Sequence, residues 1–347
     1  MASRDREIVS SGAGLAAAAV VETGAELGEL EPVRARGYWE QVWRRFRRDK
    51  VAIGAGVFII LMFLGAFVGA PVAANLLGHG PNDLFANGIN IATLLPVGPW
   101  THVHTDTGGT TLFILGADSS VGRDEFLRLF YGAQVSLEVA LGATILTMLV
   151  GVTMGLMAGY FGGWIDTIIS RVTEVTMAFP LLLFAIALAS TAGQHLDTIT
   201  FGFLAKGVFT LIIVGGVFSW YYPARIVRAQ VLSLREKEFV EAARMVGSSD
   251  FRIMRSHLLP HLVAPIIVYS TLVVAQNVLA EAGLSFLGLG IQLPTSSWGN
   301  MLGSAPDFYT VQPWLMVWPG LAVLLATLAF NLLGDGLRDA FDPRSSH

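Results

Sequence analysis

The residue types that most often perform catalysis are sparse in this chain and stand far apart. Ser285 has no histidine in its own apolar stretch, so a hydrolase would lack the base that activates its nucleophile. His102 and His104 form an HVH pair without a nearby carboxylate or cysteine, which falls short of a metal-ligand set. None of the three lysines follows the glycine-rich spacing of an ATP-binding loop. These observations argue against an enzyme and against ATP hydrolysis by this chain.

Three polar side chains near the predicted outer end of an apolar stretch could serve transport instead. Gln276, Asn277 and Glu281 fall within about one helical turn, which predicts a polar face on that helix. Polar residues inside a membrane usually face the interior of a helix bundle or a water-filled route. Two interpretations stay open for this group: a role in the substrate path or gate, and hydrogen bonding between helices.

A charged amphipathic segment, residues 238–260, separates two apolar stretches. A helix here would gather its apolar residues on one face, in a stripe formed by Phe239, Val240, Ala243 and Val246. Gly247 can adopt the left-handed conformation that ends a helix, and a second helix capped by one of residues 248–250 is predicted to begin near Phe251. The predicted unit is a helix, a sharp turn and a helix, which either docks a partner protein or lies passively on the lipid surface.

The composition places these groups in a membrane protein. Of the 347 residues, 53% are hydrophobic and 14% are charged, whereas about a quarter of an average soluble domain is charged. Cysteine is absent, which excludes a disulfide framework and a thiolate metal site. A membrane-spanning helix needs roughly 20 predominantly apolar residues. Six stretches approach this length: residues 51–74, 139–159, 175–192, 208–222, 262–280 and 313–333.

Basic residues are distributed unequally between the segments that connect these spans. With a cytoplasmic N-terminus, nineteen of the twenty-two Lys and Arg residues fall on the cytoplasmic side, as does segment 238–260. The positive-inside rule therefore predicts an all-α polytopic protein with about six transmembrane helices and both termini in the cytoplasm. We expect a cytoplasmic tail with a basic, aromatic interfacial segment (1–50), a first span (51–74), an external loop (75–130), a core with five spans (131–338) and a cytoplasmic tail (339–347).

Residues 241–260 resemble the cytoplasmic EAA loop of permeases from ATP-binding-cassette (ABC) importers. The resemblance rests on the spacing of Glu241, Ala242, Ala243, Gly247, Leu259 and Pro260. It implies that these residues couple the permease to an ATPase subunit.

Further motifs resemble the C-type permeases of the oligopeptide, dipeptide and nickel importers. Residues 118–133 are similar to the external GRD and YGA motifs of that family, residues 281–302 to its EASLSFLGLG and WGNML motifs, and residues 313–344 to its NLLGDGLRD ending. Gln134 stands where Arg is common, and Gly283 replaces a Ser. The glycine-broken stretch after Glu281 is predicted to dip back toward the membrane as a lid on the pathway. The rest of the external loop and the first 34 residues show no family pattern.

The resemblance implies a type I ABC importer permease fold with a cytoplasmic coupling helix, in the cytoplasmic (inner) membrane of a prokaryote. The implied partners are a homologous B-type permease, one or two cytoplasmic ATPase subunits, an external substrate-binding protein and membrane lipid, but no nucleic acid. No cofactor is expected on this chain, because the ATPase subunits would use ATP and Mg. The implied substrates are di- or oligopeptides.

Two alternatives to peptide import remain. The same machinery carries nickel chelates, glutathione or another small solute in other systems. An ATP-independent secondary transporter or channel belongs to a different class; such transporters often show repeated halves, and no repeat is apparent here.

Overall fold

The computed structural model of the chain describes residues 37–104, 109–118, 121–180, 182–188, 191 and 207–342. The chain divides into two compact units, residues 1–44 and 45–347. Of the first unit the structure describes the start of α2 (Tyr38–Phe46). All elements named below belong to the second unit.

Five helical segments among the described residues are long and apolar enough to cross a membrane. They are α3 (Lys50–Leu64), continued by a π-helical turn (Gly65–Gly69) and α4 (Ala70–Leu77); α5 (Glu125–Phe161); α8 (Val208–Ser219) followed by α9 (Tyr221–Leu234); α12 (Leu259–Phe286) with the residues before it from Asp250; and α14 (Trp314–Phe341). Five of the six predicted spans coincide with these helices, with longer bounds.

The third predicted span, residues 175–192, is wrong as one continuous helix. α6 (Gly163–Ala178) ends before Pro180, and the helix Leu182–Leu188 is turned by 88° from it. Phe179 has extended backbone (φ −90°, ψ 128°), which is the conformation that a following proline favours. The two helices count as a sixth span only as a bent pair. Part of the predicted span, including Ala192, lies outside the described residues.

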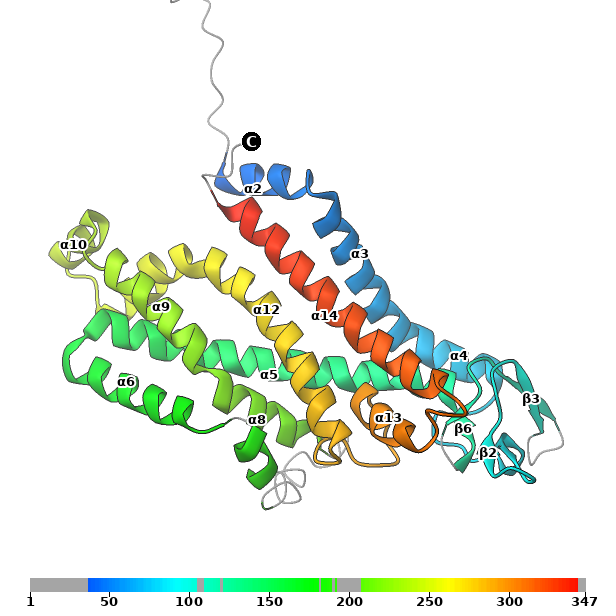
Figure 1. Cartoon of the computed structure of the whole chain (residues 1–347). Coiled ribbons are helices and arrows are strands. Elements are labelled where there is room, and N and C mark those ends of the chain that lie inside the picture. Colours follow the sequence, from blue (N-terminus) through cyan, green and yellow to red (C-terminus); the bar gives the residue numbers. More distant parts are fainter. Residues whose placement is uncertain are drawn as a thin grey trace, which may run out of the picture. The chain divides into compact units, whose positions relative to one another are not determined.

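α5 is the helix against which most of this unit packs. With 37 residues it is about 55 Å long, and it contacts α8, α9 and α12. Gly151, Gly155 and Gly159 face α9, where a Cβ on each glycine would approach α9 atoms to between 2.5 and 2.7 Å. Glycine at every fourth position therefore lets the two helices approach closely along this face. α14 lies beside α3 and α12 (Figure 1).

The predicted external loop contains regular structure. β1 (Ile89–Asn90) pairs with β2 (Leu95–Pro96), β3 (Thr101–His104) with β4 (Thr110–Phe113), and β5 (Ala117–Asp118) with β6 (Arg123–Asp124), each pair antiparallel; a 3-10 turn covers Ala86–Gly88. Phe85, Val97, Val103, Phe113 and Ala117 form a small apolar core among these strands. α4 continues to Leu77 and α5 begins at Glu125, so both helices reach into the range predicted as the external loop, residues 75–130.

Aspartate side chains cap the N-termini of α3 and α5. Asp49 Oδ1 accepts hydrogen bonds of 2.9 and 3.0 Å from two backbone N–H groups in the first turn of α3. Asp124 Oδ1 accepts bonds of 2.8 and 3.3 Å in the first turn of α5. Both side chains satisfy N–H groups that have no partner within the helix, which fixes where the helices begin.

Short helices occupy the two ends of the unit. α10 (Glu238–Met245), α11 (Asp250–Arg252) and a π-helical stretch (Ile253–Leu258) precede α12, while α13 (Trp298–Ser304) and a 3-10 turn (Ala305–Asp307) lie between α12 and α14. Figure 1 shows α10 at the opposite end of this unit from the external strands. The predicted coupling segment and the external strands therefore lie far apart, joined by the long helices.

Candidate functional site

The turn between α10 and α11 is the first candidate site, and its backbone follows the prediction. α10 ends at Met245, Gly247 has a φ of 81°, and α11 begins at Asp250. A residue with a Cβ is strained at that φ, so Gly247 permits the sharp reversal. No described atom lies within 4 Å of the position that a Cβ would take at Gly247. The backbone conformation, and not crowding, therefore requires glycine here.

The inner side of this turn is packed against the long helices. Val240, Ile253 and Leu258 are fully buried and share an apolar cluster with Val231 of α9 and Leu262 of α12. Helices this short are not stable in isolation. Their packing into this cluster holds them in place.

Tyr160, near the end of α5, contacts residues of both α10 and α11. Its hydroxyl donates a hydrogen bond of 2.7 Å to Asp250 Oδ1, and the guanidinium of Arg244 lies 5.3 Å from the centre of its ring. The Tyr160 side chain is buried. The sequence analysis missed these contacts, because they join residues about 90 positions apart.

The outer side of the turn exposes apolar side chains. Met245, Val246 and Phe251 are 83%, 86% and 68% exposed. Val246 therefore differs from Val240 and Ala243, the buried members of the predicted apolar stripe, because it follows the last residue of α10 and lies outside their apolar cluster. Adjacent exposed apolar side chains are typical of a surface that another protein covers. We call these three residues the apolar tip.

The six predicted coupling residues are divided between exposed and supporting positions. Glu241, Ala242, Gly247 and Pro260 are exposed, Leu259 is half-buried and Ala243 is buried. Glu241, Ala242 and Gly247 are close to the apolar tip in sequence. Pro260 stands at the start of α12, directly after the π-helical stretch Ile253–Leu258.

The second candidate group, at the outer end of α12, is split between two faces. Asn277 and Glu281 are buried, whereas Gln276 is exposed. The predicted single polar face is therefore wrong, because consecutive helical residues point about 100° apart. Asn277 Nδ2 donates a hydrogen bond of 2.9 Å to Thr144 Oγ1 on α5. This is the bond between helices that one of the two interpretations expected.

The Glu281 carboxylate lies among serines at the end of α12. Ser285 Oγ donates to Glu281 Oε1 at 2.7 Å and accepts from the backbone N–H of Ile291 at 3.1 Å. Ser136 and Ser297 approach the same carboxylate, although Oε2 has no hydrogen bond of ordinary length and alignment.

Ser136 and Ser297 also hold the backbone of α13. Ser136 Oγ accepts from the N–H of Trp298, and Ser297 Oγ accepts from the N–H of Asn300, both at 3.2 Å. Glu281 therefore faces the hydroxyls that fix the segment after α12, and together with Asn277 it also lines a small cavity of about 30 Å³ between α5, α8 and α12.

A buried ion-pair network joins the external strands to the start of α5. Asp118 Oδ2 accepts hydrogen bonds from Arg123 Nη2 at 2.7 Å and Nε at 3.0 Å. Arg128 Nε lies 2.8 Å from the same oxygen, without the alignment of a hydrogen bond. Arg128 Nη1 also donates to the carbonyl of Pro294 at 3.2 Å. The external motif recognised in the sequence therefore holds three segments together.

His79 is buried beside this network. Its Nε2 lies 3.0 Å from Asp124 Oδ2 and its Nδ1 lies 3.1 Å from the carbonyl oxygen of Leu77. Burial opposes protonation, but the bonds to Asp124 and Leu77 and the nearby carboxylate charges outweigh it and raise the pKa of His79 above its ordinary value.

Comparison with known proteins gives matches over most of the chain. A family model described as "Binding-protein-dependent transport system inner membrane component" matches residues 151–347, and one described as "N-terminal TM domain of oligopeptide transport permease C" matches residues 37–96. The second match corrects the expectation that the start of the external loop shows no family pattern.

Curated relatives align over nearly their full lengths. The glutathione transport system permease protein GsiD of Pectobacterium atrosepticum is 35% identical over 92% of this chain and 96% of its own. The dipeptide transport system permease protein DppC of Alkalihalophilus pseudofirmus is 36% identical over 88% of this chain and 90% of its own. A solved structure of the MetNI methionine ABC transporter covers 62% of this chain and 96% of that chain, at 18% identity and a TM-score of 0.49.

Proposed function

This chain belongs to the family of binding-protein-dependent transport system inner-membrane components, and we propose that it forms, with a homologous B-type permease, the pathway by which di- or oligopeptides enter the cell. Members of this family are multi-pass permease subunits of ABC importers in the bacterial inner membrane, not enzymes. The proposed importer also contains one or two cytoplasmic ATPase subunits, which use ATP and Mg, and an external binding protein that delivers the peptide. This chain itself binds no cofactor in the proposed mechanism.

The observation that carries the proposal is the apolar tip beside Glu241 and Gly247. Full burial of a Val, Met or Phe side chain contributes about 1.5–3 kcal/mol. Three such side chains, exposed on a turn whose other side is firmly packed, offer enough apolar surface for a partner to dock. A helix that only lies on the lipid surface would need neither the sharp reversal at Gly247 nor the contacts of Tyr160 with α10 and α11.

The same geometry supports a route for coupling. The turn is joined to α5 by Tyr160 and to α9 and α12 by the buried cluster around Val240. Movement of an ATPase would therefore shift these helices together as a rigid body, since packed cores do not deform continuously.

The peptide substrate is supported by the names of the relatives. The two relatives reported above are named as permeases for glutathione and for dipeptides, and glutathione is itself a small peptide. Glutathione is therefore the alternative substrate that a specific observation favours.

The test is affinity purification of the tagged chain in mild detergent, with mass spectrometry of the co-purified proteins. We expect a second permease and one or two ATPases. Val246→Glu places a charge on the apolar tip and is expected to lose the ATPases while keeping the second permease. Ile91→Glu is the matched control, because Ile91 is 84% exposed in the external segment. Undiminished recovery of ATPases with Val246→Glu would contradict the docking assignment.

A further inference from the structure

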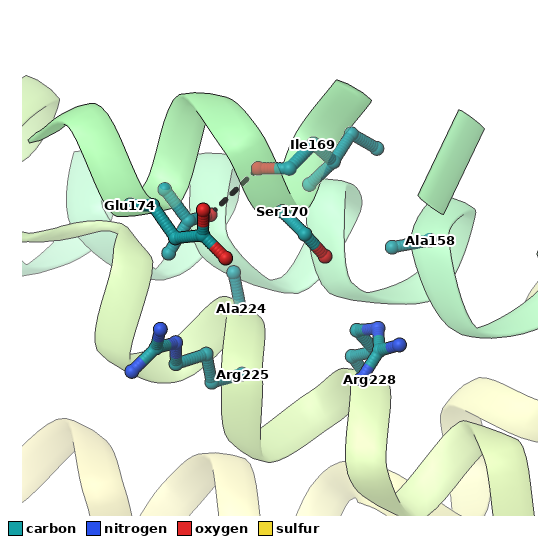
Figure 2. Close-up of a pocket in the computed structure, with 8 residues that line it drawn as sticks. Ala158, Ile169, Ser170, Glu174, Ala224, Arg225 and Arg228 are labelled. Atoms are coloured by element: carbon teal, nitrogen blue, oxygen red, sulfur yellow. Dashed lines mark hydrogen bonds between the residues drawn. The ribbon is translucent and has the colours of Figure 1, made fainter. Parts of the chain in front are cut away.

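A cavity of about 220 Å³ lies between α5, α6 and α9. Figure 2 shows Ser170 and Glu174 directed from α6 toward α9, which contributes Arg225 and Arg228. The cavity wall therefore carries charges of both signs on two facing helices. These residues belong to neither of the sites described above.

Arg228 is already engaged within the chain. Its Nη2 donates to Asp166 Oδ2 at 2.6 Å and its Nε donates to Asp166 Oδ1 at 2.5 Å. Ser170 Oγ donates to the same carboxylate at 3.3 Å. The pair between Arg228 and Asp166 thus holds α6 against α9 beside the cavity.

Arg225 and Glu174 retain binding capacity. Arg225 is exposed, and among the described residues no ion pair or hydrogen bond joins it to another side chain. Glu174 accepts a bond from Arg171 at 2.6 Å through Oε2, but that pair is largely exposed and therefore weak. The charged groups of Glu174 and Arg225 line one cavity yet lie more than 4.0 Å apart. Arg225 lies just past the predicted span 208–222, so its exposed guanidinium is accessible to an anion from the cytoplasmic side.

We propose that this cavity binds the charged termini of the transported peptide, with Arg225 holding the carboxylate and Glu174 the ammonium group. The inference rests on the peptide-transport function proposed above and adds a site on this chain for it. The planar guanidinium of Arg225 can bind a carboxylate through two parallel hydrogen bonds. Glu174 can accept an ammonium hydrogen through Oε1.

The size and charge of the cavity favour a zwitterion over a simple anion. Its volume equals that of roughly seven water molecules at about 30 Å³ each, and a dipeptide extends about 7 Å between its ends. A lipid phosphate would be attracted by Arg225 but repelled by Glu174, whereas the charge of Asp166 is already compensated by Arg228. A peptide with both termini free satisfies the two opposite charges together.

The experiment measures uptake by the complete importer in proteoliposomes, with its own binding protein and ATP. The probes are a labelled dipeptide with free termini, the same dipeptide amidated at its C-terminus, and the same dipeptide acetylated at its N-terminus. Arg225→Gln is expected to lower the preference for the free over the amidated peptide by about tenfold, since a charged hydrogen bond contributes roughly that factor. Arg225→Lys should retain most of the preference. Glu174→Gln should lower the preference for the free over the acetylated peptide.

Equilibrium binding of the labelled dipeptide to the purified complex without the binding protein removes any effect of delivery. Weaker binding to the Arg225→Gln complex, with restoration by Arg225→Lys, supports the site. Equal losses for free and amidated peptide, or no loss, overturn it while leaving peptide transport intact. A defect confined to liposomes with anionic lipid assigns Arg225 to a lipid phosphate and also overturns it. If the wild-type importer moves no peptide, the proposed function itself fails.

Discussion

At the scale of single residues, Gly247 and Tyr160 shape the cytoplasmic turn in different ways. Gly247 supplies a backbone conformation that the other residues adopt only under strain, with a φ of 81°. Tyr160 supplies contacts, through its hydroxyl to Asp250 and its ring to Arg244. The first residue therefore determines where the chain reverses between α10 and α11, and the second joins the turn to α5.

Gly247→Arg is expected to abolish ATP-driven uptake while leaving membrane insertion intact. Left-handed backbone costs a non-glycine residue about 1–2 kcal/mol, and the substitution adds a long cationic side chain beside the apolar tip. Uptake of labelled peptide and the amount of chain in the membrane fraction are the two measurements. Gly247→Asn is the control, because asparagine tolerates this conformation better and should keep most of the uptake. Normal uptake by Gly247→Arg would contradict the docking role.

Glu241→Lys is expected to reduce uptake by at least about tenfold, which corresponds to about 1.4 kcal/mol of docking free energy. Glu241 is exposed on α10 and its reversal should leave the fold unchanged. Glu236→Lys, an exposed position before α10, serves as the control. ATPase recovery on the tagged chain should fall in parallel; retained ATPase binding with normal uptake would remove Glu241 from the contact.

His79 should make the stability of the external segment depend on pH. Its folded-state pKa is raised above the ordinary 6.5, so its contribution is complete below that value and is lost as the pH rises through the raised pKa. Thermal unfolding of the detergent-solubilised protein over a pH series should show this decline. His79→Asn should remove it. If the variant keeps the wild-type pH dependence, other groups cause it.

At the scale of elements, the contact of α5 with α9 depends on residues without side chains. Gly151, Gly155 and Gly159 let the two backbones approach, and the carbonyl oxygen of Ala224 lies 2.6 Å from the Cβ position of Gly155. Close approach matters in a membrane, because helix association there depends on van der Waals packing rather than on the hydrophobic effect. α5 and α9 also line the cavity beside Arg225.

Gly155→Ala is expected to destabilise the protein by about 1–3 kcal/mol, the usual cost of forcing extra volume into a packed interior. Gly54→Ala is the matched control, because no described atom lies within 4 Å of its Cβ position in α3. Thermal unfolding in detergent compares the two variants. An equal effect of both substitutions would mean that the close contact does not limit stability.

At the scale of the whole molecule, the external strands, α5 and the segment after α12 depend on one carboxylate. Asp118 binds Arg123 and Arg128, and Arg128 reaches Pro294, which is more than 160 positions away in the chain. The serines around Glu281 attach the same segment to α12 and α5. Two polar groups thus connect the outer ends of helices that are distant in sequence.

Asp118→Asn is expected to cost about 3–5 kcal/mol, because it leaves two buried arginines without a charged partner. The exposed pair of Arg171 and Glu174 provides the comparison, and Arg171→Gln should cost less than about 1 kcal/mol. Thermal unfolding and protease cleavage of the external segment measure the difference. Similar costs for the two variants would show that burial of the Asp118 network adds no stability.

The sequence by itself determined the features that depend on local pattern. Continuous apolar stretches predict membrane helices, because every backbone polar group in lipid must be bonded within the segment. Five spans were predictable for this reason. The reversal at Gly247 was predictable because glycine adopts left-handed backbone without strain. The external and C-terminal motifs identified the family, although the role of Asp118 in linking segments was hidden.

Only the tertiary structure decided which side chains are covered and which are free. Val246 fits the apolar stripe of α10 by spacing, but it is exposed, because among the described residues the apolar cluster that buries Val240 and Ala243 does not extend to it. Gln276 and Asn277 are neighbours in sequence, yet only Asn277 meets α5. The bend after α6, the partners of Glu281 and the cavity at Arg225 all depend on elements brought together from distant positions. Burial is a property of those contacts, and for that reason the spacing of residues along one segment could not specify it.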